Sequence, residues 1–494
     1  MPITDERSGG KGITVKRSTM NRRDFLNSAC AGGAGALLTG CGCGKNISGG
    51  KKPPNILFVM IDDLGKEWLS CYGGEEMTTP NFDRLAAGGI RFTNAYSMPQ
   101  CTPTRVALLT GQYPWRNGWI NHWDVPRWGA GCHFDWNRYT TFARVLRDAG
   151  YATAAAGKWQ VNDFRVQPDA MDRHGFDEWC MWTGYETGNP PSAERYYNPY
   201  INTRDGSRTY EEQFGADVFT DFLIDFMRRH RNGPMLCYFP MCLTHTPFTT
   251  TPLDPDVTEK IDCQKAMVRY ADHCLGRLLD ALDDLGIREN TLVFLTTDNG
   301  STRGISARMN GRLVKGGKAT LGENGVCEPF IVNCPGTVPS GVVSDALTDF
   351  TDMMPTFTEL AGVSIPEGTP VDGASIAEVL TGRAADTSRD WILGMGFGPA
   401  RLTKQGVEPV QTFTDRVVRD KRYKLWIENG TPSRLFDLEN DSGEAENLIG
   451  SADSAVAEAR HRLETVVQSF PRRDARPQYD PLPPQPWDRK PEGS

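Results

Sequence analysis

Residues 56–63 read Ile-Leu-Phe-Val-Met-Ile-Asp-Asp, and this stretch indicates the fold. An apolar run without alternation is typical of a β-strand that is buried on both faces, as in a parallel sheet covered by helices. Two carboxylates, Asp62 and Asp63, follow the run directly. Open α/β sheets assemble their binding sites at the carboxyl ends of their strands. We therefore expect a parallel sheet with a functional site beside Asp62 and Asp63.

Strand and helix patterns alternate along the chain up to about residue 382. Further strands are expected at 151–156, 235–239, 292–296 and 330–332, and helices at 79–87, 140–149, 214–229, 264–285 and 349–360. Such alternation predicts an α/β fold in which a large, mainly parallel sheet lies between layers of helices.

The pattern changes in the last quarter of the chain. Short strand patterns at 415–420, 423–427 and 434–438, followed by a helix at 454–470, predict a smaller C-terminal α+β domain with an antiparallel sheet. A proline-rich tail comes after it. We divide the chain into a signal and tether (1–50), a catalytic domain (51–382), a small C-terminal subdomain (383–470) and the tail (471–494).

The first fifty residues resemble an export address. Asn21-Arg22-Arg23-Asp24-Phe25-Leu26 is a twin-arginine pattern, and residues 29–38 are small and apolar, as in signals read by the Tat export machinery. Leu38-Thr39-Gly40-Cys41 is similar to a lipobox, in which Cys41 is lipidated; the alternative is a plain signal with an incidental Cys41. We expect an exported protein, periplasmic or at the cell surface, that meets the membrane only through a lipid anchor.

Overall composition narrows the function only slightly. The net charge of -8 argues against a nucleic-acid partner, because the basic footprint of such proteins is missing. Thirteen cysteines are scattered without a disulfide or zinc spacing. A few local cations can still bind an anionic substrate.

The segment Cys101-Thr102-Pro103-Thr104-Arg105 carries the sharpest chemical pattern. A capping threonine, a first-turn proline and the apolar residues 106–109 predict the start of a buried helix. Cys101 would then lie at the positive end of the helix, where an anion is favoured. Arg105, one turn later, can reach the same place as a bidentate clamp.

Cys-x-Pro-x-Arg followed by an apolar helix and Thr110-Gly111 resembles the signature of the formylglycine-dependent sulfatases, which have an alkaline-phosphatase-like fold. The resemblance implies that a maturation enzyme oxidises Cys101 to formylglycine, whose hydrated aldehyde attacks the sulfur of a sulfate monoester. Outside the cell, sulfated carbohydrates are the expected substrates.

A metal site is implied by the same resemblance. Thr297-Asp298-Asn299-Gly300 follows a second buried strand, as Asp62-Asp63 follows the first. Carboxylate and amide oxygens suit Ca²⁺, with Mg²⁺ the less favoured ion. The family's metal ligands correspond here to Asp62, Asp63, Cys101, Asp298 and Asn299.

Gly157-Lys158-Trp159-Gln160 resembles a second sulfatase signature, in which Lys158 binds the sulfate. The family usually has histidine at the position of Gln160, and that histidine helps to eliminate sulfate. Glutamine can form hydrogen bonds to a substrate but cannot take up a proton. His122 and His133 lie between the two signatures and are candidates for the missing base.

Two later elements complete the resemblance. Thr244-His245-Thr246-Pro247 is similar to the family's His-x-Pro element, whose histidine contacts the bridging oxygen of the ester. Gly316-Gly317-Lys318 would bring Lys318 to the same oxygen, although Cys327 replaces a usual arginine nearby. The predicted catalytic residues are Cys101, Arg105, Lys158, His245 and Lys318, with Gln160 as a further substrate contact.

Two other functions fit the same residues. One is a phosphate or phosphonate ester hydrolase of the same superfamily. The other is a lipoprotein that binds sulfated glycans without cleaving them, which Gln160 favours.

Overall fold

The computed structural model describes residues 52–120, 132–184, 195–396, 398–403, 406–483 and 485–486. The predicted signal and Cys41 lie outside the described residues, as does His122. The chain from Lys52 onward forms one compact unit.

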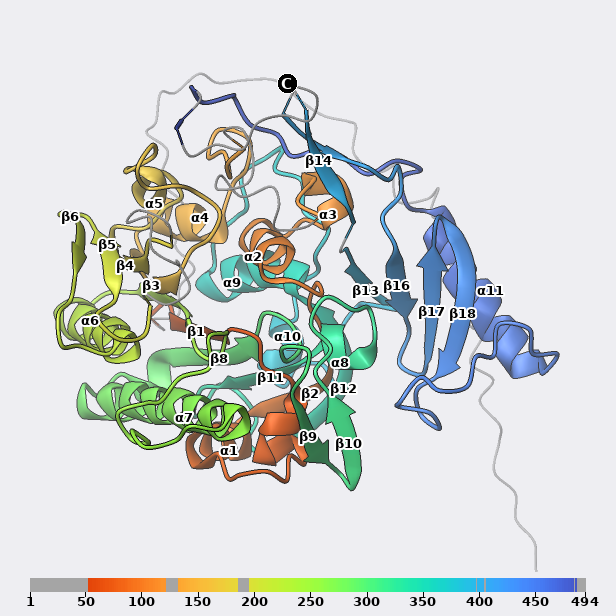
Figure 1. Cartoon of the computed structure of the whole chain (residues 1–494), viewed down its shortest axis with the longest axis horizontal. Helices are drawn as coiled ribbons and strands as arrows, with labels where there is room; N and C mark the ends of the chain where they lie inside the picture. Colours follow the sequence, from red (N-terminus) through yellow and green to blue (C-terminus); the bar gives the residue numbers. More distant parts are fainter. Residues whose placement is uncertain are drawn as a thin grey trace, which may run out of the picture. The chain divides into compact units, whose positions relative to one another are not determined.

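A ten-stranded sheet organises this unit (Figure 1). Its central strand β1 pairs in parallel with both of its neighbours, β7 and β8. Strand β11 runs antiparallel to β2 and β8, and the edge strands β5 and β6 are antiparallel as well. The spatial order is β12 (Val342–Asp349), β2 (Ile90–Tyr96), β11 (Cys327–Asn333), β8 (Thr291–Thr297), β1 (Asn55–Ile61), β7 (Met235–Pro240), β3 (Ala152–Lys158), β4 (Glu178–Trp182), β5 (Tyr200–Thr203) and β6 (Gly206–Thr209). The predicted large, mainly parallel sheet is confirmed.

Helices cover both faces of the sheet (Figure 1). One face packs against α2 (Cys101–Thr110), α4 (Phe142–Asp148) and α9 (Met353–Ala361), and the other against α1 (Pro80–Ala87), α6 (Gly215–His230) and α7 (Lys260–Asp284). Ile56, Phe58 and Met60 enter the first core, whereas Leu57, Val59 and Ile61 enter the second. This is why the run is apolar at every position, because successive side chains of a strand point to opposite faces.

Several element boundaries differ from expectation. The helix expected at 349–360 begins only at Met353, because the Asp349 side chain caps a 3-10 turn over Phe350–Asp352 first. Strand β2 was not anticipated, although it lies between β12 and β11 in the sheet. The short helices are α3 (Pro114–Asn117), α5 (Ala170–Arg173), α8 (Glu323–Val326) and α10 (Ala377–Leu380), and two hairpins are β9 (Ser306–Met309) with β10 (Arg312–Lys315) and β14 (Ala400–Thr403) with β15 (Gly406–Pro409).

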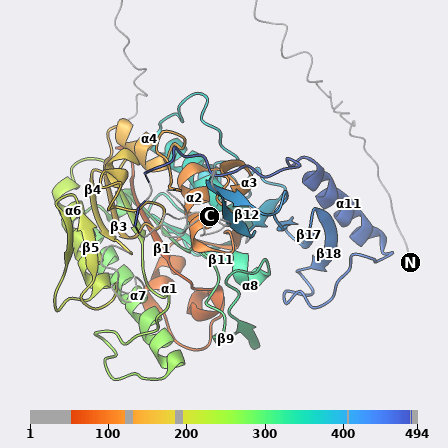
Figure 2. The ribbon, with the colours of Figure 1, turned by 45° about the horizontal axis from the view of Figure 1, so that its top comes forward.

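A second, antiparallel sheet occupies the C-terminal part of the chain (Figure 2). Its order is β13 (Ile392–Met395), β16 (Arg416–Arg419), β17 (Tyr423–Glu428) and β18 (Thr431–Asp437), and α11 (Ser454–Gln468) packs against it. The expected small C-terminal sheet domain is confirmed, with β13 as a strand beyond those predicted. The exact domain boundaries stay a prediction.

The described part of the tail is tied to the rest of the unit by hydrogen bonds. The amide of Ala475 donates to the Trp115 carbonyl at 2.9 Å, and the amide of Gln478 donates to the Tyr139 hydroxyl at 2.8 Å. Asp474 forms an ion pair with the buried Arg416 at 2.7 Å. Within the described residues, no helix combines the length and the apolar character needed to cross a bilayer.

His174 is a buried histidine that lies away from the carboxylates at the strand ends. Its side chain is fully buried and its ring stacks on Phe134, with the centroids 4.5 Å apart. Nε2 lies 2.9 Å from the Phe134 carbonyl and donates to it, and Nδ1 has no hydrogen-bond partner among the described residues. Burial lowers the pKa of His174 to about 3.

We expect His174 to make the protein acid-labile. The pKa of His174 in the folded protein is below the value of about 6.5 in the unfolded chain, so the unfolded chain binds more protons. The contribution of His174 to the free energy of unfolding is therefore complete above about pH 6.5 and is lost as the pH falls toward about 3. This costs roughly 1.4 kcal/mol per pH unit within that window. His174→Gln keeps a donor for the Phe134 carbonyl but cannot titrate, so its urea-unfolding free energy should depend less steeply on pH. The exposed His461 provides the control His461→Gln, and equal slopes in both variants would contradict the assignment.

Candidate active site

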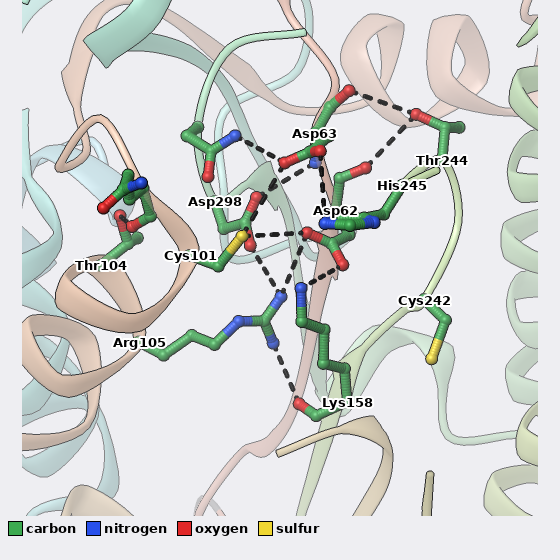
Figure 3. A network of polar contacts seen from close by, with 12 residues as sticks. Asp62, Asp63, Cys101, Thr104, Arg105, Lys158, Cys242, Thr244, His245 and Asp298 are labelled. Carbon is green, nitrogen blue, oxygen red and sulfur yellow. Dashed lines mark hydrogen bonds and ion pairs between the residues drawn. The ribbon is translucent and has the colours of Figure 1, made fainter. Parts of the chain in front are cut away.

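Charged side chains converge at the carboxyl end of the large sheet (Figure 3). Asp62 and Asp63 follow β1, Asp298 follows β8, Lys158 ends β3 and Cys101 begins α2. All five are buried. The sequence separates them by up to about 240 positions, and the fold brings them together because their strands are neighbours or near neighbours in one sheet.

Asp62 lies between two cations. Lys158 Nζ donates to its Oδ2 at 2.6 Å, and Arg105 NH2 is 3.8 Å from its Oδ1. Burial, the largest effect, opposes ionisation of this carboxyl group, but its electrostatic interactions with Lys158, His245 and Arg105 outweigh burial and hold its pKa well below the usual range. Asp62 is therefore a carboxylate at neutral pH.

Arg105 fixes the helix α2 to the strand ends. It follows Cys101 by one helical turn, and its NH2 donates to Asp298 Oδ2 at 2.7 Å while NH1 donates to the Lys158 carbonyl at 3.0 Å. The side chain is 1% exposed. Arg105 was predicted to reach the same place as Cys101, and its guanidinium group does lie beside the carboxylates that the Cys101 thiol faces.

Asp63 contacts a second set of side chains in the same cluster. Its Oδ2 accepts from Lys318 Nζ at 2.6 Å and from Thr302 Oγ1 at 3.0 Å, and His245 Nε2 is 3.7 Å away. Its Oδ1 accepts from Asn299 Nδ2 at 2.8 Å. Burial raises the pKa of Asp63, yet Lys318 and His245 more than compensate, so it is lowered overall.

The Cys101 thiol faces these carboxylates. Sγ is 3.4 Å from Asp62 Oδ1 and 3.8 Å from Asp63 Oδ1. The helix begins at Cys101 itself after Gln100, whose side chain forms no capping bond, so the expected capping by Thr102 was wrong. Burial, followed by the negative charge of Asp298, raises the pKa of the thiol. An unmodified Cys101 is thus a protonated, weak nucleophile at neutral pH.

The cluster has the donors for a metal ion. Asp62, Asp63 and Cys101 each offer a ligand atom, and these atoms lie within 4.8 Å of one another and of a ring nitrogen of His245. Asp298 Oδ1 accepts from the Asp63 amide at 3.1 Å, which places this predicted ligand beside the group. Asn299 Oδ1 is buried with no hydrogen-bond partner among the described residues. Carboxylate oxygens and an unpaired amide oxygen are the donors that a hard divalent cation needs, so the residues fit such an ion.

The remaining predicted residues lie differently. Gln160 is partly buried, with a left-handed φ of 71° and a buried Oε1 that has no partner among the described residues. His133 lies 3.8 Å from Asp135, and its ring contacts Tyr479 of the tail at 5.7 Å. The His133 ring also lies 6.4 Å from the Trp136 ring.

Two contributors to the cluster were missed. Thr302 lies only four positions after Asp298, so its closeness in sequence was an available signal. Arg195, which contacts His245 Nδ1 at 2.6 Å, belongs to no recognisable motif.

A cavity of about 740 Å³ lies apart from these residues, beside the β9–β10 hairpin and the C-terminal sheet. Its lining includes Arg419 and Glu323, which form an ion pair at 3.0 Å.

Comparison with known proteins decides the family. The family model described as Sulfatase matches residues 54–363, more than half of the chain. This chain belongs to the sulfatase family. A second model, N-sulphoglucosamine sulphohydrolase, C-terminal, matches residues 317–470 of the sulfatase.

Curated relatives of this sulfatase are similar over most of its length. N-acetylgalactosamine-6-sulfatase of Canis lupus familiaris is 33% identical over 389 residues, covering 72% of this chain and 71% of the relative. Arylsulfatase A of Bos taurus is 31% identical over 461 residues, covering 84% and 87%. The enzyme is accordingly a sulfuric ester hydrolase.

Solved structures show the same fold. Ps i-CgsB has a TM-score of 0.71 and 24% identity, with 87% of this chain and 95% of that chain covered. BT4656 in complex with its substrate D-glucosamine-2-N,6-O-disulfate has a TM-score of 0.67 and 22% identity, with 85% and 97% covered.

We expect a divalent cation to stabilise the folded sulfatase through the Asp62–Asp63 cluster. A ligand that binds only the folded state at about 100 times its Kd adds about 2.7 kcal/mol to the free energy of unfolding. Addition of Ca²⁺ should therefore raise the Tm of the wild-type protein, and Mg²⁺ should raise it less. Asp298→Asn should abolish the shift, whereas Asp172→Asn, at a half-buried surface pair, should keep it. If neither Ca²⁺ nor Mg²⁺ changes the Tm of the wild-type protein, the metal site is contradicted.

Proposed function

We propose that this sulfatase hydrolyses sulfate monoesters of carbohydrates, with Ca²⁺ at the Asp62–Asp63 cluster and formylglycine made from Cys101. The observation that carries the proposal is the position of Cys101 Sγ, 3.4 Å from Asp62 and at the start of a helix whose Arg105 reaches the same cluster. A nucleophile formed there meets a sulfate group that is surrounded by fixed positive charge.

The protein's own cations neutralise the sulfate. Arg105, Lys158 and Lys318 are held at the cluster by ion pairs of 2.6 to 2.7 Å with Asp298, Asp62 and Asp63. Such preorganised charges stabilise a transition state without reorganising during the reaction. When bound, Ca²⁺ and hydrated formylglycine add a further positive centre and the attacking hydroxyl group.

His245 and Lys318 assist the departure of the alcohol. Both side chains face Asp63 Oδ2, at 3.7 and 2.6 Å. Burial opposes the charged form of Lys318, but Asp63, Cys101 and Asp62 raise its pKa overall, so it stays an ammonium group. It can stabilise the negative charge that develops on the bridging oxygen, and it can supply the proton with which the alcohol leaves. In sum, ester and water give alcohol, sulfate and one proton.

Relatives support a sulfated carbohydrate as the substrate class. The curated relatives include N-acetylgalactosamine-6-sulfatases, and BT4656 was solved with a sulfated glucosamine. Ca²⁺ is favoured over Mg²⁺ because the cluster offers several carboxylates rather than the mostly hydrated octahedral environment that Mg²⁺ prefers.

The proposal includes the route by which the enzyme reaches its substrate. The twin arginine at Arg22-Arg23 and the lipobox ending in Cys41 support export through the Tat machinery and attachment by lipid to the cell surface or the periplasmic side of a membrane. A formylglycine-generating enzyme is then a required partner before export.

Gln160 is the residue that favours the second candidate function, a protein that binds sulfated glycans without cleaving them. Gln160 cannot take up a proton, and its buried Oε1 has no hydrogen-bond partner in the part of the chain that the structure describes, which suits a contact to a sugar hydroxyl group without acid–base chemistry. A non-catalytic glycan-binding protein would use the same contact, so turnover distinguishes the two functions.

Cys101→Ser should reduce turnover of 4-nitrophenyl sulfate by at least about 1,000-fold, because a plain hydroxyl group cannot form the aldehyde hydrate. Wild-type enzyme from a host that makes formylglycine should cleave the aryl sulfate in preference to 4-nitrophenyl phosphate and phenylphosphonate esters. Cys180→Ser, which alters another buried cysteine, should retain activity. Preference for a phosphate ester would favour the superfamily alternative, and glycan binding with an unmodified Cys101 peptide in mass spectrometry would favour the binding protein.

Cys41→Ser should release the enzyme from the membrane fraction without changing its specific activity. A single cysteine carries the predicted anchor, and the catalytic cluster lies in the compact unit from Lys52 onward. Fractionation of the expressing cells and an activity assay of each fraction measure the effect. Unchanged fractionation would indicate a plain signal peptide.

A further inference from the structure

Arg195 is a buried cation without a carboxylate partner among the described residues. Its side chain is 1% exposed, and its guanidinium carbon lies 4.6 Å from the centre of the Trp182 ring. Nε forms no hydrogen bond within the described part of the chain. Burial of a charge without an opposite charge is costly, and the aromatic face offsets only part of that cost.

The guanidinium group binds the side of His245 that faces away from Asp63. Arg195 NH2 lies 2.6 Å from His245 Nδ1, and it also donates to the Thr246 carbonyl. A guanidinium group only donates hydrogen bonds, so Nδ1 must offer its lone pair. A neutral imidazole that accepts at Nδ1 carries its proton on Nε2.

A competing tautomer is available to the same ring. His245 Nδ1 lies 2.7 Å from the Thr246 carbonyl oxygen, which accepts a proton if Nδ1 carries one. In that arrangement Nε2 has no proton. The N–H groups of Arg195 would then point at an N–H group, so the guanidinium group excludes this tautomer.

The tautomer of His245 decides whether its Nε2 donates or accepts a hydrogen bond. Nε2 lies 3.7 Å from Asp63 Oδ2, where Lys318 Nζ also donates. A proton on Nε2 makes this nitrogen a hydrogen-bond donor directed into the cluster. A bare Nε2 would be an acceptor there and would oppose the developing negative charge of a leaving oxygen.

We propose that Arg195 is a positioning residue that fixes the tautomer of His245, so that Nε2–H faces the bridging oxygen of the sulfate ester. The inference rests on the proposed function for the identity of that oxygen, but the tautomer itself does not depend on turnover. Arg195 acts through His245 and does not touch the substrate.

Leaving-group dependence is the kinetic test. Arg195→Met removes the donor and keeps an apolar stem against Trp182, and Arg195→Lys keeps a cationic donor. For phenyl sulfate, whose phenolate leaves poorly, kcat of Arg195→Met should fall by about 100-fold, the usual loss for one catalytic hydrogen-bond donor. For 4-nitrophenyl sulfate the loss should be about 10-fold or less, because the better leaving group needs less stabilisation. KM should change little for either ester, and Arg195→Lys should recover part of the lost kcat.

Arg416→Met is the matched control. Arg416 is also fully buried, and its ion pair is with Asp474 of the tail, outside the Asp62–Asp63 cluster. Its loss should lower the Tm but should affect phenyl sulfate and 4-nitrophenyl sulfate equally. Equal losses for both esters in Arg195→Met would reduce Arg195 to a structural residue and overturn the proposal.

Nitrogen NMR of ring-labelled histidine separates this proposal from the proposed function. The chain has 7 histidines, and the His245 signals are assigned by their loss in His245→Asn. The wild-type signals should show a protonated Nε2, and Arg195→Met should shift the proton to Nδ1. A protonated Nδ1 in the wild type, or an unchanged tautomer in a folded Arg195→Met, would refute the role of Arg195 even in an active sulfatase. If no sulfate ester is cleaved, the proposed function fails while the tautomer still decides the proposal; if Arg195→Met does not fold, the wild type and Arg195→Lys decide it.

Discussion

The ion pair between Lys158 and Asp62 connects the ends of β3 and β1 across the intervening strand β7, and the arrangement of the candidate active site depends on it. Three buried carboxylates would repel one another if they stood alone at the strand ends. Lys158, Arg105 and Lys318 each form an ion pair with one of these carboxylates at 2.6 to 2.7 Å, so each negative charge has an opposite charge beside it. A buried network of this kind contributes little to stability compared with an apolar core, but it fixes the position of every member.

The apolar strands make that arrangement possible. Because β1 is buried on both faces, its two sets of side chains anchor two separate cores, and the strand end cannot shift relative to either helix layer. The same rigidity applies to β8, which Asp298 directly follows, and to α2, whose residues are all buried. Arg105 and Lys158 lie on regular elements, and Asp62, Asp63 and Asp298 directly follow the ends of buried strands. Groups fixed in this way are held more precisely than groups on long loops.

Local sequence patterns located most of the cluster, although the expected cap at Thr102 was wrong. The carboxylates after buried strands, the cysteine at a helix start and the arginine one turn later were predicted from spacing, and Lys158, His245 and Lys318 came from family resemblance; all of them lie in one cluster. Strand β2 was missed because Asn94 and Arg91 interrupt its apolar residues, and its place beside β11 is set by long-range pairing. Arg195 could not be found, because its function arises from contact with a ring 50 residues away, to which no sequence spacing points.

The seclusion of Cys101 imposes an order of events on biosynthesis. With 4% of the residue exposed and α2 packed into the core, no modifying enzyme can reach the thiol once the sheet and helices have assembled. If Cys101 becomes formylglycine, as proposed, its oxidation has to occur on the nascent or still open chain, and the folding that follows encloses the aldehyde. A translocation system that accepts only completed proteins would then inherit a molecule whose chemical fate was already decided in the cytosol.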